Sequence, residues 1–232
     1  PGPFALPLVR HLDADIRISA NRVRTGGAEL GQSAAALSIK KGKLLADIAE
    51  VAIDGTASGS GQLTVDTNGL QPRYLFRGKV AGFDLARLAA DQFGVTALQG
   101  RGDVIADVTA TGDTATELLR TVSGKLSLAM PAGGRLGVDV KSLLSAAQKQ
   151  PVHGWAPHAR GSTTVESLQS RLVLSEGVVY TESFSAALAD GLLTATGGGN
   201  LRSGLVDVRL SMGARAASDQ SAASFSRATE SI

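Results

Sequence analysis

Two histidines have the side chains best suited to acid–base or metal chemistry in this sequence. His153 and His158 stand five residues apart in a segment rich in Pro and Gly. A zinc site needs three or four ligands, and no Asp, Glu or Cys stands near them before Glu166. His11 stands alone beside Arg10. We therefore interpret the histidines as solvated loop residues, and the sequence predicts neither a metal nor another cofactor.

Two short patterns match known motifs by spacing alone. Ser38 and Lys41 have the S-x-x-K spacing of penicillin-recognising enzymes, in which the serine opens a helix. Here the serine lies on a predicted strand that leads into a turn. Arg101-Gly102-Asp103 spells an adhesion tripeptide, which we interpret as a turn. Neither pattern therefore predicts an activity. The absence of cysteine also excludes disulfides and thiol catalysis.

Pairs of aspartates share a predicted strand face. Asp13 with Asp15, and Asp103 with Asp107, place two carboxylates on one side of a strand, an arrangement that serves glycoside hydrolysis. A solvated sheet face explains them more simply, because Arg17 and other polar residues alternate with them. A hydrolase would also need a clustered pair of histidine and carboxylate. We therefore predict that the chain is not an enzyme.

The charge pattern does not favour nucleic-acid binding. The formal net charge is only +2, with Lys and Arg spread among Asp and Glu. A nucleic-acid surface needs a basic patch interleaved with stacking aromatic residues, and only Tyr74 and Phe76 lie near a basic cluster. We predict no nucleic-acid partner and interpret the two basic clusters as solvated strand faces: Arg17, Arg22 and Arg24, and Arg73, Arg77 and Lys79.

Strict alternation of apolar and polar residues is the main structural signal. It runs from Leu12 to Ser19 and predicts a strand with one apolar and one polar face. The pattern recurs along the chain, and such two-sided strands are typical of antiparallel sheets. The candidate residues of the apolar face are Leu12, Ala14, Ile16, Ile18, Leu37, Ile39, Leu63, Val65, Val104, Val108, Leu126, Leu128, Leu172, Leu174, Phe184, Leu188, Val206, Val208 and Leu210.

Tight turns separate the predicted strands. Glycine makes up 28 of 232 residues, well above the usual share of about 7%. Their spacing predicts strands of about ten residues, so we expect a mainly β fold with long antiparallel strands and a few short helices. The dipeptides that supply the positive φ values of hairpin turns are Lys41-Gly42, Asp54-Gly55, Asn68-Gly69, Glu176-Gly177 and Asp190-Gly191.

Three polar residues can start short helices. Asp84 and Asp139 are candidate N-caps, and Thr114 with Glu117 has the form of a capping box. The predicted organisation is a lead-in over 1–11, one or more β-repeat units over 12–150 with helices near 84–91, 114–121 and 139–149, a loop over 151–162, a second unit over 163–212 and a poorly ordered tail over 213–232.

Internal echoes indicate that the strands are built as repeated units. Residues 56–63 are echoed by 194–201, and residues 82–85 by 137–140. Such units form solenoids or long open sheets. The apolar face then has two possible fates: the closed core of a sandwich, or a surface left partly open as a groove for acyl chains, where many Ala and Gly leave room. The residues alone leave both open.

These strand, turn and cap patterns resemble the AsmA family of bacterial envelope proteins. The resemblance covers residues 8–212 approximately and looks like the C-terminal part of a member. The tail after Met212 departs from the usual family ending, and the family has no catalytic residues to carry over. The segments that carry the resemblance are 12–20, 23–24, 35–44, 82–85, 100–102, 122–126 and 137–140.

The resemblance implies more than the residues show. Members are similar to chorein-type bridge proteins, whose curved, taco-shaped sheets enclose an apolar groove. The implied role is to hold phospholipid or another acyl lipid in the periplasm, contributing to phospholipid transport to the outer membrane and to its integrity. Because the sequence begins at Pro1 without a Met, we expect the inner-membrane anchor in a segment absent from this chain. The alternative is a structural or assembly module that packs on envelope protein partners.

Overall fold

The computed structural model describes residues 9–25, 28–53, 55–86, 98–147 and 161–213. Within these ranges the chain is mainly β, as the alternation predicted. The helices are α3 (Ala115–Thr121) and α4 (Val140–Ala147). The strands are β1 (Ala14–Ala20), β2 (Val23–Thr25), β3 (Ala28–Lys40), β4 (Lys43–Ile53), β5 (Ala57–Asp66), β6 (Arg73–Asp84), β7 (Leu98–Gln99), β8 (Arg101–Thr111), β9 (Ser123–Met130), β10 (Gly134–Leu136), β11 (Thr163–Val165), β12 (Ser167–Ser175), β13 (Val178–Leu188), β14 (Gly191–Asn200) and β15 (Val206–Gly213).

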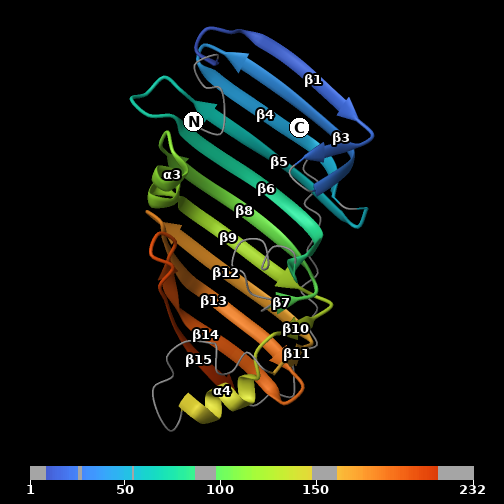
Figure 1. Cartoon of the computed structure of the whole chain (residues 1–232), viewed down its shortest axis with the longest axis vertical. Coiled ribbons are helices and arrows are strands. Elements are labelled where there is room, and N and C mark those ends of the chain that lie inside the picture. Colours follow the sequence, from blue (N-terminus) through green and yellow to red (C-terminus); the bar gives the residue numbers. More distant parts are fainter. Residues whose placement is uncertain (1–8, 26–27, 54, 87–97, 148–160, 214–232) are drawn as a thin grey trace, which may run out of the picture.

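Twelve strands form one large antiparallel sheet. Its order is β1-β3-β4-β5-β6-β8-β9-β12-β13-β14-β15, with β2 also paired to β3. The strands cross the long axis of the molecule one after another, from β1 at the top of Figure 1 to β15 near the bottom. Because β1 and β15 lie at opposite ends of this order, the sheet is open. Of the two architectures that the sequence allowed, the structure therefore has the open sheet and not the closed sandwich.

Hairpin turns account for this simple order. Lys41 and Gly42 have φ values of 50° and 74°, and Glu176 and Gly177 have 50° and 77°. Two consecutive positive φ values define the type I′ turn, whose twist suits a two-residue hairpin. The Asn68-Gly69 dipeptide differs from the prediction, because β5 and β6 are joined by a longer loop over 67–72. The Asn68 side chain is used there to bind another turn.

The helices lie at two of the three expected starts. Thr114 caps α3 in a capping box with Glu117, and the Asp139 carboxylate accepts a hydrogen bond from the Ser142 backbone N–H at the start of α4. For the helix expected over 84–91, Leu85 and Ala86 are helical, and residues 87–91 lie outside the described ranges. The division into repeat units stays a prediction.

The strand register separates two faces of the sheet, because residues directly opposite each other in neighbouring strands lie on the same side. We call the two sides the apolar face and the polar face. One row of the apolar face crosses all eleven consecutive strands as Ile16, Leu37, Ala46, Leu63, Phe76, Val108, Gly124, Leu174, Val179, Gly199 and Val206. The adjacent row of the polar face is Arg17, Ala36, Asp47, Gln62, Arg77, Asp107, Lys125, Val173, Tyr180, Gly198 and Asp207.

A small second layer accompanies the large sheet at one end. Strands β7, β10 and β11 form a three-stranded sheet in the order β11-β10-β7, and α4 lies beyond it at the bottom of Figure 1. The main hydrophobic cluster combines residues of this layer and its flanks with residues of the large sheet: Leu85, Val140 and Val165 with Met130, Leu168, Ala186, Leu188 and Leu193. At this end of the molecule, the large sheet and the small layer therefore enclose a packed hydrophobic core.

Candidate apolar binding surface

The register places the sequence-predicted apolar residues together. All of them except Leu12 fall on the apolar face of the large sheet. Leu12 comes before β1 begins at Ala14, so the strand pairing does not assign it to a face. The alternation therefore predicted the composition of this surface from sequence, since side chains two residues apart on a strand point the same way.

The apolar face has a covered part and an open part. In the covered part, around the hydrophobic cluster, Leu168 is 3% exposed and Met130 is fully buried. In the open part, on β1 and β6, Ile16 is 45% exposed, Ile18 is 49% exposed and Phe76 is also exposed. Large apolar side chains in water are costly at about 25 cal/mol per Å². The open part can therefore bind an apolar molecule favourably.

Small residues lie opposite one another in the middle of the open part. Gly61 of β5 lies opposite Gly78 of β6, which lies opposite Ala106 of β8. The Phe76 ring fills the space beside them: a Cβ added to Gly78 would come within 2.6 Å of the ring Cζ atom. An aromatic ring over a cross-strand glycine pair shields the backbone. Larger side chains here would displace the ring.

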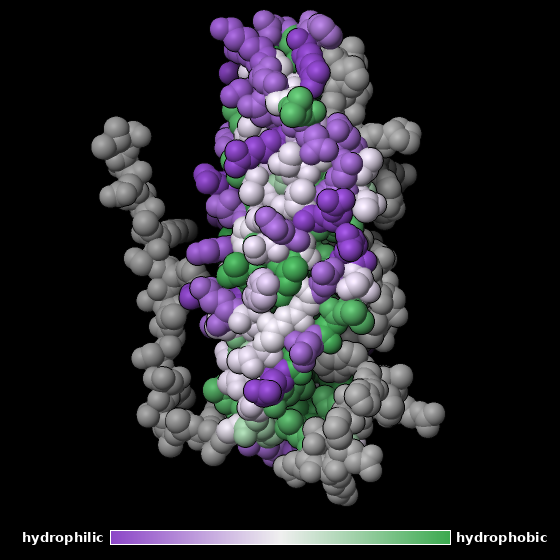
Figure 2. Space-filling model, turned by 90° about the vertical axis from the view of Figure 1, so that its left-hand side faces the viewer, coloured by the Kyte–Doolittle hydropathy of each residue, from purple (hydrophilic) through white to green (hydrophobic). Residues whose placement is uncertain are grey.

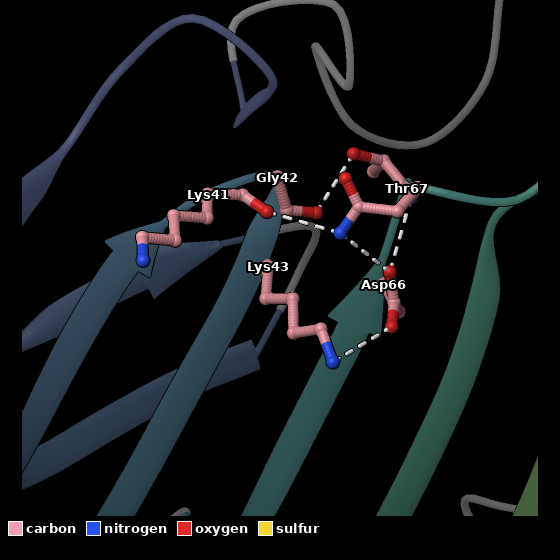
Figure 3. Close-up of polar contacts among 6 residues, drawn as sticks. Lys41, Gly42, Lys43, Asp66 and Thr67 are labelled. Carbon is pink, nitrogen blue, oxygen red and sulfur yellow. Dashed lines mark hydrogen bonds and ion pairs between the residues drawn. The ribbon is translucent and has the colours of Figure 1, made fainter.

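One end of the open part is fixed by two interlocked turns (Figure 3). The Thr67 hydroxyl donates to the Gly42 carbonyl at 2.8 Å, and the Asn68 side-chain amide donates to the Lys41 carbonyl at 3.0 Å. Lys43 forms an ion pair with Asp66 at 3.1 Å. The Asn68 backbone N–H, followed by the Lys43 ammonium, lowers the pKa of Asp66. These contacts hold the ends of β3 to β6 in register.

The edge of the sheet that carries α3 and these turns changes character along the molecule. Figure 2 shows hydrophilic residues over its upper part, while hydrophobic residues gather towards the lower end. Three exposed apolar residues belong to the segment after β14 and the start of β15: Leu201, Leu205 and Val206. The last strands therefore expose apolar side chains beside a polar edge.

The hydroxyl of Tyr74, a residue only 8% exposed, lies on the apolar face near this edge. Tyr74 lies opposite Val65 and Ala110, and its hydroxyl is buried without a hydrogen-bond partner in the described part of the chain. Burial raises the pKa of the Tyr74 hydroxyl. An unsatisfied buried hydroxyl is destabilising by about 1–3 kcal/mol. No sequence pattern distinguished this tyrosine from an ordinary strand aromatic.

Ser38 and its neighbours, which match the S-x-x-K spacing, form polar contacts with the aspartates before and within β1. The Ser38 hydroxyl donates to Asp15 at 2.6 Å, and Lys40 forms an ion pair with the same carboxylate at 2.8 Å. The Lys40 hydrogen bond, followed by that of Ser38, lowers the pKa of Asp15. Asp13 accepts a hydrogen bond from the Lys41 backbone N–H. Ser38 thus lies on a strand and binds a carboxylate, so its spacing to Lys41 has no catalytic geometry.

The other aspartate pair is separated by its partners. Asp107 forms an ion pair with Arg77 at 3.1 Å, while Asp103 accepts a hydrogen bond from the Gly82 backbone N–H. The interpretation of 101–103 as a turn is wrong, because these residues begin β8 and pair with β6. Gly102 is buried beneath Leu85 and Met130, which explains the glycine without any adhesive role.

A hollow of about 530 Å³ indents the polar face in the described part of the chain. Its walls include the side chains of Asp47, Gln62, Arg77, Lys79 and Asp107. Both signs of charge face it, so it does not select an anion or a cation. In the described ranges no three residues among His, Asp and Glu come together as metal ligands. His153 and His158 lie outside those ranges.

Comparison with known protein families shows which family this chain belongs to. The model of the AsmA family matches residues 3–184, which is more than half of the chain. The chain belongs to the AsmA family. AsmA proteins are associated with outer-membrane biogenesis and lipid transport, are envelope or periplasmic proteins and are generally not enzymes. No curated protein and no solved structure matches the chain.

The AsmA match ends before the sheet does. It stops within β13, yet β14 and β15 continue the same order and the same apolar face. The resemblance seen in the sequence extended to 212 for this reason, since the alternation continues there. Among the described residues, no helix is both long and apolar enough to span a bilayer.

Sequence reasoning missed what covers the apolar face of this AsmA chain. The covering strands β7, β10 and β11 have only two or three residues each, too few for alternation to be detected. Val140 and Val165 are nearly fully buried there. The signal available was the apolar character of α4, where Leu143 is buried and Leu144 packs against the cluster.

Proposed function

We propose that this chain is a non-enzymatic periplasmic segment of an envelope protein that holds lipid acyl chains on the open part of its apolar face. The observation that carries the proposal is the uninterrupted apolar row across eleven strands together with the exposure of Ile16, Ile18 and Phe76. Each CH₂ group that leaves water gains about 0.8 kcal/mol. An acyl chain lying along the row would gain on every carbon.

The same surface explains why the lipid head group would stay in water. The row contains no charged or hydrogen-bonding side chain to desolvate or to bind a phosphate, and burying an unpaired charge is strongly unfavourable. The surface therefore fits phospholipids through their acyl chains with little head-group selection. Membership of the AsmA family supports a role in moving phospholipid toward the outer membrane and in outer-membrane integrity. We propose that tethering to the inner membrane resides in a segment absent from this chain.

The test compares two isoleucines of equal exposure on opposite faces. Ile18 is 49% exposed on the apolar face, and Ile105 is 50% exposed on the polar face. Purified chain is extracted and examined by native mass spectrometry for bound phospholipid. Ile18→Asp should lose most of the lipid that the wild type retains, while Ile105→Asp should retain it. Equal retention by both variants, or a lipid-free wild type, would contradict the proposal.

The covered part supports a second candidate, a structural or assembly module that packs on partner envelope proteins. The observation that supports it is the cluster of buried residues at one end, where tightly packed side chains leave no room for lipid. If this function holds for the whole face, the chain carries no lipid. The exposed isoleucines would then become protected from solvent only when a partner protein is added, as measured by hydrogen exchange of the neighbouring strands.

A further inference from the structure

The last strand of the sheet has an unused edge with an ordered charge pattern. In the described ranges, β15 pairs with β14 on one side and with no strand on the other. Asp207 and Arg209 are exposed on the polar face, and among the described residues neither side chain has a hydrogen-bond or ion-pair partner. Their neighbours on β14 are Gly198 and Thr196, which carry no charge. Both charges are thus available to something that lies beside β15.

The pattern Asp207-Val208-Arg209 is complementary to itself. In an antiparallel pair of two β15 strands centred on Val208, Asp207 of each copy lies opposite Arg209 of the other, because residues at equal distance on either side of the centre face each other. The pairing therefore forms two cross-strand pairs of opposite charge. On the apolar face the same register places Val206 opposite Leu210, and Val206 is strongly exposed in the single chain. Both faces therefore match.

The other edge of the sheet shows why β15 is the better candidate. Strand β1 repeats the pattern as Asp15-Ile16-Arg17. Its carboxylate, however, already binds Lys40 at 2.8 Å and Ser38 at 2.6 Å on β3. Pairing there would have to compete with these contacts, whereas β15 has no such contacts to lose.

We propose that β15 is an interface between two copies of this chain, which pair their β15 strands antiparallel about a two-fold axis through Val208. An unprotected edge strand is a template for another strand, and a two-fold interface requires a self-complementary surface. The pairing leaves both apolar faces on the same side, so they join into one wider surface. The inference stands independently of whether lipid binds, because it rests on charges and backbone at the edge.

Charge substitutions test the interface directly by measuring self-association of the whole chain in sedimentation experiments over a concentration series. Arg209→Asp and Asp207→Arg should each abolish the dimer, since both cross-strand charge pairs become repulsive. An equimolar mixture of the two variants should restore association as a mixed dimer, and the double swap Asp207→Arg/Arg209→Asp should dimerise alone. A monomeric wild type, or single variants that dimerise normally, would overturn the proposal.

A crosslink fixes the register. The chain has no cysteine, so Val208→Cys introduces one thiol at the predicted axis, where the two Cβ atoms would lie about 4.5–5.5 Å apart. Mild oxidation should yield a covalent dimer. Ile16→Cys is the matched control on β1 and should remain monomeric. A crosslink through Ile16→Cys in place of Val208→Cys would place the interface at β1, the opposite edge of the sheet, and overturn the proposal.

Discussion

The two parts of the apolar face share one pattern and differ in their surroundings. Both consist of alternating apolar residues joined by antiparallel pairing, and Phe76 in the open part lies in the same row as Leu174 on β12. Leu168 is nevertheless buried while Ile16 is half exposed. The difference comes from segments outside the sheet, namely α4 and the small sheet. An amphipathic strand thus defines a side to be covered, and other parts of the chain decide whether it is.

The two type I′ turns teach the same lesson on a smaller scale. Lys41-Gly42 is held by Asn68 and Thr67 of the next loop. The Glu176 and Gly177 backbone N–H groups instead donate to the Ser123 hydroxyl and the Val122 carbonyl beside α3. Two turns with closely similar φ values are therefore stabilised by unrelated partners, because the turn sequence fixes only the hairpin.

The largest expected effect is a difference in stability between the two parts. Leu168→Ala removes a side chain from the packed cluster and should lower the free energy of unfolding by about 2–5 kcal/mol. Ile16→Ala should cost less than about 1 kcal/mol, because nearly half of that side chain is already in water. Urea denaturation measures both. Equal losses would mean that the open part is packed as tightly as the covered part.

The next largest loss of stability is expected where the two interlocked turns meet at Gly42. Gly42→Ala combines a φ of +74° with a new Cβ atom 2.5 Å from the Asn68 side-chain oxygen, and positive φ alone costs about 1–2 kcal/mol for a residue with a Cβ. Gly55→Ala is the control, because its φ of +69° is similar and nothing lies within 4 Å. Thermal unfolding should show a larger loss for Gly42→Ala. Matching losses would show that Asn68 moves aside freely.

A smaller effect is expected at the buried tyrosine. Tyr74→Phe removes a hydroxyl that has no partner, so lipid-free protein should be unchanged or more stable by up to about 1 kcal/mol. Tyr180→Phe, on the polar face and 52% exposed, should leave stability unchanged. Differential scanning calorimetry separates the two. Marked destabilisation by Tyr74→Phe would show that the hydroxyl has a binding partner in solution.

The smallest expected effect is a pH dependence at the turn edge. The folded pKa of Asp66 is lowered, so the carboxylate stabilises the fold above its unfolded pKa of about 3.9. That contribution is lost as pH falls through the lower folded value. Asp66→Asn should therefore weaken the acid-induced loss of stability in this window. An identical acid profile for wild type and variant would show that Asp66 is not linked to folding.

The sequence by itself determined the strands, the hairpin turns and the membership of the apolar face. These features are local: alternation fixes which side chains share a side of a strand, and Lys41-Gly42 and Glu176-Gly177 fix φ at two turns. The register then followed, since slipping by one residue would turn the apolar residues into water. The candidate surface could be predicted to this extent from the residues alone.

Tertiary structure alone decided that the sheet is open and which part of it is covered. The covering residues, among them Leu85, Val140 and Val165, come from the connections between β6 and β8 and between β9 and β12. Their segments are too short for a periodic signal, and their position depends on where β8, β9 and β12 lie in the sheet. Burial is a property of the packed chain, so a residue's neighbours in space, which alternation does not encode, determine whether it meets core or solvent.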